Sequence, residues 1–147
     1  MAKGRGMIMT REKDAVTLDE YAMGEEQIGQ IEGVLDRLVA IGVHCVMVID
    51  MAGNIVAIRD NGKTRINVYS LAALAAANFG AVEAMAKLVG EEEFSLLFHK
   101  GAQESLHFLK INPDLLMLTI FGPEMTLGLL RIKSSETAAH IRSIWLR

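Results

Sequence analysis

Apolar residues recur at steps of three and four positions near both ends of the chain, a spacing typical of helices with one buried face. The first set begins after Gly24, ends at Gly42 and comprises Ile28, Ile31, Leu35 and Leu38. The second set comprises Leu127, Leu130, Ala138, Ile141 and Trp145. The pattern therefore predicts one helix over 24–42 and another over 126–146.

Between these helices the pattern changes to short, nearly continuous apolar runs. The runs lie at 43–50, 55–58, 94–100, 105–111 and 115–121, and turn-forming residues such as Gly53-Asn54 and Asn112-Pro113 separate them. Such runs are typical of β-strands with both faces covered. Because the connections within each group are too short for a parallel crossover, we expect the strands to be antiparallel.

A third helix is predicted from Asn67, a good N-terminal cap, to Gly90, a good C-terminal stop. The order of elements is then α-β-β-α-β-β-β-α. This order predicts an α/β (α+β) fold with a five-stranded antiparallel sheet and helices on both faces. We expect one domain over 24–147, preceded by a flexible N-terminal tail over 1–23.

The central helix contains two stripes of different bulk. The large side chains are predicted to pack on the sheet, and they are Leu71, Leu74, Val82, Met85 and Leu88. Small residues form the second stripe, which is expected to face outward and to serve as an interface with a partner or a second copy. The predicted interface residues are Ala73, Ala76, Ala77, Gly80 and Ala84.

Two other interpretations of these alanines stay open. Alanine is a strong helix former, and another part of the same chain could cover the stripe. Helix propensity does not explain Gly80, because glycine costs up to about 1 kcal/mol in a helix interior. Close packing against another backbone would offset that cost.

Composition narrows the class of protein. The chain has 147 residues, of which 51% are hydrophobic and 5% aromatic, and its net charge is −3. The apolar fraction excludes disorder throughout, and the single cysteine excludes a disulfide scaffold. Polar and charged residues interrupt the longest apolar run, 68–90, so no membrane insertion is expected. The absence of a signal-peptide core predicts a cytoplasmic protein, and the mild acidity argues against nucleic acid as a partner.

Charge is unevenly distributed along the chain. Residues 24–42 contain four acidic residues and one arginine, whereas 131–147 contain four basic residues and one glutamate. This asymmetry fits ordinary solvated faces, two neighbouring helices of opposite charge, or a basic face for an acidic partner.

The motif Gly62-Lys63-Thr64 resembles the end of a phosphate-binding loop. The full motif requires a glycine five residues before Gly62, where this chain has Ala57. The preceding strands form a predicted hairpin rather than the parallel strand of nucleotide-binding folds. We therefore expect an ordinary polar loop.

Two further groupings could support chemistry. His99 and His107 could face each other across a hairpin, but no third ligand has a spacing suited to zinc. His44 and Cys45 are neighbours in a strand and so point to opposite faces, which argues against a nucleophile and its base. We assign no catalytic, cofactor-binding or metal-binding residue.

Four segments occur in a recognisable order. They are Leu35-Asp36-Arg37-Leu38, Gly53-Asn54-Ile55-Val56-Ala57, Ser70-Leu71-Ala72-Ala73-Leu74-Ala75-Ala76 and Thr126-Leu127-Gly128-Leu129-Leu130-Arg131. Together they resemble the Roadblock family, whose members include dynein light chains and regulators of small GTPases. Residues 86–94 and 98–101 are similar to the bacterial MglB type of that family.

The resemblance implies a Roadblock/longin-like fold and a homodimer in which the sheets join and the central helices pair. It also implies that a small Ras-like GTPase docks on the dimer, with Ala73 and Ala77 at matching positions, and hydrolyses GTP faster. Arg59, Arg65 and Arg131 could enter the partner's site, but the MglB type implies instead that the partner's switch regions are reshaped. The alternatives are an adaptor or scaffold subunit of a GTPase or motor complex, and a small-molecule sensor.

Overall fold

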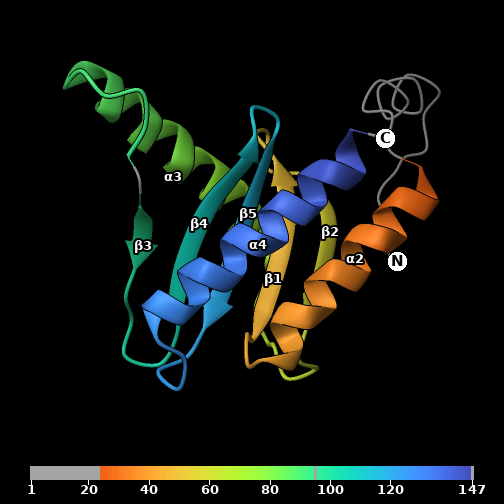
Figure 1. Cartoon of the computed structure of the whole chain (residues 1–147). Helices are drawn as coiled ribbons and strands as arrows, with labels where there is room; N and C mark the ends of the chain where they lie inside the picture. Colours follow the sequence, from red (N-terminus) through yellow and green to blue (C-terminus); the bar gives the residue numbers. More distant parts are fainter. Residues whose placement is uncertain (1–23, 95, 147) are drawn as a thin grey trace.

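The computed structural model describes residues 24–94 and 96–146, and the predicted tail over 1–23 lies outside them. The elements follow the predicted order, and Figure 1 shows their arrangement. They are α2 (Glu25–Ala40), β1 (Cys45–Asp50), β2 (Ile55–Asp60), α3 (Val68–Leu88), β3 (Leu97–His99), β4 (Ser105–Asn112), β5 (Leu115–Phe121) and α4 (Leu127–Trp145).

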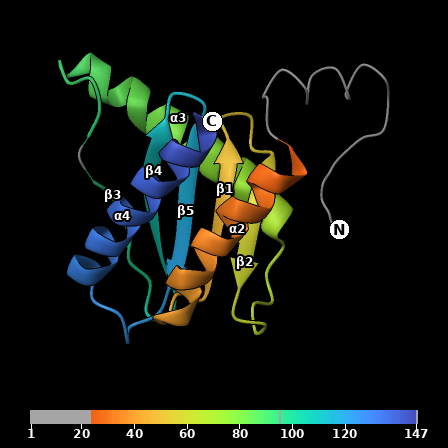
Figure 2. The ribbon, with the colours of Figure 1, turned by 45° about the vertical axis from the view of Figure 1, so that its right-hand side comes forward.

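The five strands form one antiparallel sheet in the order β2-β1-β5-β4-β3. β5 lies in the middle of that order with β1 beside it, and every residue of these two strands is buried. This burial confirms that both faces of these two strands are covered, whereas β2, β3 and β4 contain residues that are half-buried or exposed. Figure 2 shows α2 and α4 on one face of the sheet and α3 on the other.

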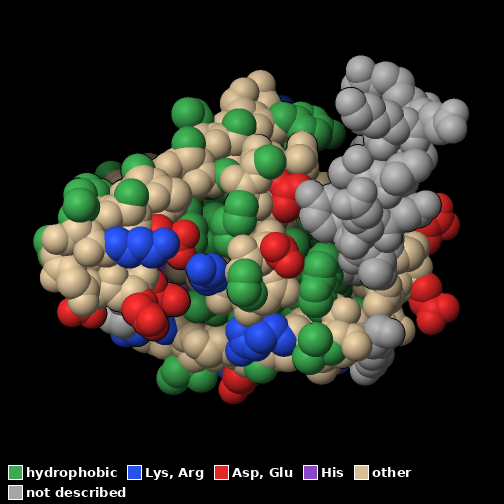
Figure 3. Space-filling view, turned by 90° about the horizontal axis from the view of Figure 1, so that it is seen from above, with side chains coloured by type: hydrophobic (Ala, Val, Ile, Leu, Met, Phe, Trp, Pro, Cys, Tyr) green, Lys and Arg blue, Asp and Glu red, His purple; other side chains and the backbone are tan. Residues whose placement is uncertain are grey.

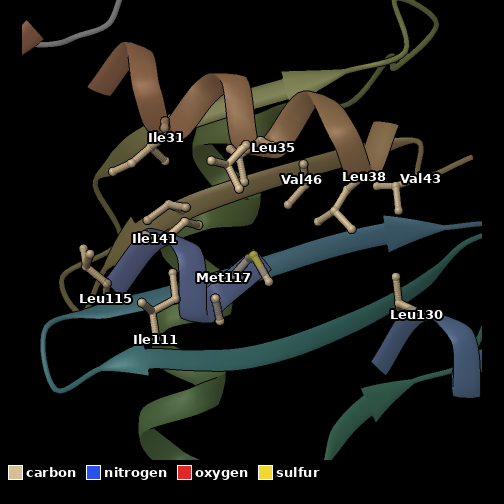
Figure 4. Packing of buried hydrophobic residues seen from close by; sticks show 14 of the residues in the cluster. Ile31, Leu35, Leu38, Val43, Val46, Ile111, Leu115, Met117, Leu130 and Ile141 are labelled. Carbon is tan, nitrogen blue, oxygen red and sulfur yellow. The ribbon is translucent and has the colours of Figure 1, made fainter. Parts of the chain in front are cut away.

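The larger part of the core lies between the sheet and the pair α2 and α4. Figure 4 shows how side chains from both helices meet those of the central strands. The fully buried members include Ile31, Leu35, Leu115, Met117 and Ile141. The apolar stripes expected on the two terminal helices therefore face the sheet.

Local sequence signals determine where the helices begin and end. The Asn67 side chain accepts a hydrogen bond from the Ser70 amide at 3.0 Å, which caps α3, and Thr126 caps α4 by accepting from the Leu129 amide at 3.2 Å. Gly90, just beyond the end of α3, has φ +88°. A left-handed residue at this point is a common way to end a helix.

The β1–β2 turn lies against α3. Its Asp50 side chain accepts hydrogen bonds from the amides of Ala52 and Asn54, at 3.0 and 2.8 Å. Gly53 has φ +92°, and a Cβ at this position would lie 2.8 Å from the Ala73 Cα. Only glycine allows both this conformation and this close approach without strain.

The main difference from the predicted elements concerns β3. Residues 94–100 were expected to form a strand, but β3 contains only Leu97–His99. Within the described residues, the strand pairs with β4 alone and is therefore an edge of the sheet. An edge strand has a neighbour on one side only, so an apolar pattern does not by itself fix how far the pairing extends.

The charge asymmetry also has a structural answer. α2 and α4 are neighbours, and they are joined by the Gln27 side chain bonded to the Ile144 carbonyl at 3.2 Å. Two acidic residues of α2, Glu32 and Asp36, pair with Arg59 of β2 at 3.3 and 3.1 Å rather than with α4. Neighbouring helices are confirmed, but the observed ion pairs lie elsewhere.

Candidate functional site

Alanine and phenylalanine, rather than the larger aliphatic residues, form the buried face of α3. The buried residues are Ala72, Ala75, Ala76, Phe79 and Ala86. Small side chains allow the helix axis to lie close to the sheet, and Phe79 packs in the same cluster. This arrangement corrects the predicted orientation of the helix.

The predicted sheet-packing stripe is largely exposed. Leu74, Met85 and Leu88 are 68%, 52% and 86% exposed, while Leu71 and Val82 lie half-buried at the margin. We call Leu74, Met85 and Leu88 the bulky stripe. The error arose because α3 is apolar on nearly every side, so bulk alone did not identify the buried face.

The small-residue stripe, defined as Ala73, Ala77, Gly80 and Ala84, is exposed. A Cβ at Gly80 would meet no atom within 4 Å. The described part of the chain therefore does not cover the stripe at this glycine. Ala76, the fifth predicted interface residue, is buried against the sheet and is not part of this exposed surface.

The two stripes occupy different flanks of α3. Asn78, which lies at helical spacing from Leu74 and Met85, contacts His99 of β3 through its Oδ1 at 3.1 Å from Nε2. The bulky stripe thus lies toward the β3 edge of the sheet. Ala73 lies beside Gly53 in the β1–β2 turn, so the small-residue stripe lies on a different flank of α3, toward the end of the strands where that turn lies.

The C-terminal part of α3 extends beyond the strands in Figures 1 and 2. Among the described residues, α3 is the one helix long and apolar enough to cross a membrane, and 22% of its most apolar window is buried. Figure 3 shows hydrophobic and uncharged side chains along the upper margin of the view, on the side where α3 lies. An exposed apolar surface of this extent indicates an interaction site.

The polar loop before α3 is not arranged to hold phosphate. The Gly62 amide donates to Asp60 at 2.8 Å, and the Lys63 amide donates to Asn61 at 2.9 Å. The Thr64 hydroxyl donates to the His44 carbonyl at 3.3 Å. The groups that a phosphate-binding loop would direct at its ligand are therefore bonded within the loop and to the residue that precedes β1.

His99 and His107 do not face each other. The β3–β4 register pairs His107 with Phe98 and His99 with Leu106, which places the two imidazoles on opposite faces of the sheet. His107 is buried on the α4 side, where burial and the nearby Arg131 lower its pKa to about 4. In the described residues, no group of three or more His, Cys, Asp or Glu side chains is placed to hold a metal ion.

Cys45 is buried on the α3 side of the sheet. Burial, with a smaller effect of Asp60, raises the pKa of its thiol to about 12. Such a thiol stays protonated at neutral pH and is a poor nucleophile. The His44 side chain points instead to Glu104 and Glu124, with ring nitrogens 2.8 and 2.7 Å from their carboxylate oxygens.

The three candidate arginines lie apart. Arg59 is held by Glu32 and Asp36, as described above, and Arg131 lies on α4, on the opposite face of the sheet from α3. Arg65 is exposed in the loop that leads into α3. The exposed stripes of α3 itself contain no arginine.

The chain is similar to known proteins in both sequence and fold. The family model of the Roadblock/LC7 domain matches residues 31–121. No curated protein matches the chain at a significant level. Among solved structures, MglB of Myxococcus xanthus is 31% identical, covers 84% of this chain and 92% of its own, and has a TM-score of 0.77.

Two further structures share the fold at lower identity. A structure described as MglB with tetrameric arrangement is 22% identical, with a TM-score of 0.77 over 83% of this chain and 92% of its own. The gliding protein MglB of Thermus thermophilus is 22% identical, with a TM-score of 0.69 over 81% of this chain and 88% of its own.

Proposed function

Because this chain belongs to the Roadblock/LC7 domain family, we propose that it is a homodimeric regulator of a small Ras-like GTPase. It acts by docking on the GTPase and reshaping the switch regions of that partner. The single observation that carries the proposal is the exposed, nearly uncharged outer face of α3, with its two distinct stripes. The similarity to MglB structures over most of the chain supports the same class of function.

Self-association is assigned to the β3 edge and the bulky stripe. β3 has a free edge that can pair with β3 of a second copy, extending the sheet. Such a pairing is two-fold symmetric and brings the same flank of each α3 together. The flank toward β3 carries Leu74 and Met85, whose burial between the two helices would be favourable.

The small-residue stripe is assigned to the GTPase. It lies on the flank away from β3, so a dimer formed through β3 would leave it accessible. Alanine and glycine allow a partner's backbone to approach closely, and their side chains contain no polar or charged group. This surface is suited to holding a switch loop in one conformation.

The proposed mechanism requires no catalytic residue of this chain. A GTPase activator must position the attacking water and neutralise charge that develops on the phosphates. The α3 stripes contain no arginine to insert, and Arg59 is held in ion pairs. Preferential binding to the hydrolysis-competent conformation would align the partner's own catalytic groups. On this proposal the protein works in the cytoplasm, without a cofactor or metal, and neither nucleic acid nor membrane insertion has a role.

The test compares GTP hydrolysis by a Ras-like GTPase encoded in the same genome with and without this protein. Faster hydrolysis supports the regulator, whereas binding without acceleration identifies the alternative, an adaptor or scaffold subunit of a GTPase or motor complex. The protein alone is expected neither to bind nor to hydrolyse GTP at micromolar concentrations. GTP bound by the isolated protein would contradict the proposal.

Two α3 variants separate the assigned surfaces. Ala77→Arg should leave the dimer intact and reduce GTPase stimulation at least tenfold, because the new side chain blocks close approach. Leu74→Arg should yield a monomer. Ser135→Arg, an exposed position on α4, is the matched control and should change neither property. Normal stimulation by the Ala77→Arg protein would contradict the assignment of the small-residue stripe.

A further inference from the structure

His44 lies where several connections meet at one end of the sheet. Its amide donates to the Ile120 carbonyl at 2.9 Å, and its carbonyl accepts from the Asn61 amide at 2.9 Å. The same carbonyl accepts from Thr64, as described above. The backbone of His44 is therefore fixed from β5 and from the β2–α3 loop.

The side chain of His44 joins two more connections. Nδ1 lies 2.8 Å from Glu104 Oε1, in the turn between β3 and β4. Nε2 lies 2.7 Å from Glu124 Oε2, in the connection between β5 and α4. Through this one imidazole, the β3–β4 turn is attached to the frame formed by the central strands.

The geometry requires a charged imidazole. An ionised carboxylate only accepts hydrogen bonds, so both ring nitrogens must donate. A neutral imidazole has one donor, and its other nitrogen would present a lone pair to a carboxylate oxygen. Loss of the proton therefore converts one of the two contacts from attraction to repulsion.

Glycine makes this close arrangement possible. A Cβ at Gly122 would lie 2.7 Å from the His44 Cε1 and would also collide with the Glu124 carboxylate. A Cβ at Gly101 would collide with the Glu104 carbonyl, within the same β3–β4 turn. Gly122 therefore lets the β5–α4 connection approach His44 more closely than another residue would permit, and Gly101 allows the β3–β4 turn itself to be tight.

The strand that precedes the Glu104 turn lies at the edge of the sheet. β3 contains three residues and pairs with β4 on one side. Phe98 stacks on Phe121 with ring centroids 5.8 Å apart, and His99 contacts Asn78 of α3. Leu97 and Phe98 also pack against the two core clusters, and the contact of the following turn with His44 adds a further restraint to these.

We propose that His44 is a protonation-controlled clamp on the edge strand β3. When the imidazole is charged, it holds the β3–β4 turn against the β5–α4 connection and keeps β3 in register. When the imidazole is neutral, the turn is released and β3 moves more freely. In the dimer of the proposed function, on which this last step rests, release weakens pairing between the two copies.

The direction of the pH dependence follows from the charges around His44. Hydrogen bonding to Glu104 is the largest effect and, together with Glu124, raises the pKa of His44 despite partial burial. The β2–α3 loop contacts His44 through the uncharged residues Asn61 and Thr64. The clamp is therefore closed below the ordinary histidine pKa of about 6.5 and opens as the pH rises through the elevated pKa.

The test uses NMR on the full chain over a range of pH. The imidazole of His44 should titrate above the ordinary value in the wild-type protein and closer to that value in Glu104→Gln. The amides of β3 should exchange with solvent roughly two- to fivefold more slowly with His44 charged than neutral, after correction for intrinsic pH effects, as expected for exposed ion pairs.

Matched variants decide the outcome. His44→Gln is neutral at every pH and should remove the pH dependence of β3 protection, whereas His140→Gln on α4 should retain it. Gly122→Ala should open the clamp without altering a titrating group. The proposed clamp would be contradicted if the pKa of His44 were at or below its ordinary value. It would also be contradicted if the protection of β3 amides from exchange changed with pH equally in His44→Gln and in the wild-type protein. A chain that stays monomeric at every pH would instead contradict the proposed dimer.

Discussion

His107 and His44 have the same side chain in opposite electrostatic surroundings. His107 is 3% exposed, and within the described chain its Nδ1 has no hydrogen-bond partner. Burial therefore favours the neutral form. His44 lies at the surface between two carboxylates, which favour the charged form. The two histidines should consequently limit stability at opposite ends of the pH range.

Acidification should destabilise the protein through His107. The pKa of this group falls from 6.5 to about 4 on folding, so the unfolded chain binds the extra proton between those values. The free energy of unfolding should therefore fall by about 3 kcal/mol as the pH drops from above 6.5 to below 4. Urea unfolding across this range measures the effect.

His107→Leu is the variant that isolates this contribution. It removes the titrating group and the unpaired Nδ1, so stability at pH 7 should be unchanged or higher. Between pH 6.5 and 4 its stability should decline less than that of the wild type. An identical acid decline in both proteins would show that other groups cause it.

At the level of elements, the sequence was sufficient for the number, order and type of helices and strands. Hydrophobic periodicity and helix caps such as Asn67 depend on residues close together in the sequence, so they can be recognised before the tertiary structure is known. The orientation of α3 was not predictable in this way, because both of its faces are apolar. The large side chain of Leu74 favoured a position against the sheet, whereas alanines and Phe79 form the face of α3 that packs there. The clamp at His44 joins residues 60 and 80 positions apart, and no local pattern signals it.

The neighbouring alanines of α3 offer a direct test of the helix orientation. Ala76→Leu places three extra carbons against the sheet and should reduce the free energy of unfolding by about 1–3 kcal/mol. Ala77→Leu adds the same atoms to an exposed position and should change stability by less than about 0.5 kcal/mol. Chemical denaturation compares the two variants, and equal destabilisation would contradict the orientation.

For the molecule as a whole, the two faces of the sheet differ in how completely they are covered. α2 and α4 lie side by side over one face and share a large core. On the other face, α3 extends beyond the strands and exposes apolar residues on both of its stripes. One face of the sheet is therefore covered by two helices, whereas the helix on the other face exposes the apolar surface that the proposed function assigns to a second copy and to the GTPase.

If two copies associate as proposed, thermal stability should depend on protein concentration. Mass action favours the folded dimer over two unfolded chains, so Tm should rise by about 2 °C for each tenfold increase in concentration. Calorimetry over two decades of concentration measures this. Leu74→Arg should show no such dependence, and a wild-type Tm that is constant over the same range would contradict a dimer linked to folding.

The two edges of the sheet are unequal. β2 has six residues, and its Arg59 is paired with α2, whereas β3 has three residues. Head-to-tail joining of β2 to β3 would leave a fresh edge at each step and could continue without limit as a fibre. Joining β3 to β3 would pair both short edges and leave the two β2 strands as the outer edges. The charged residues of β2 disfavour further strand pairing there. On the proposed β3–β3 pairing, association would therefore stop at two sheets.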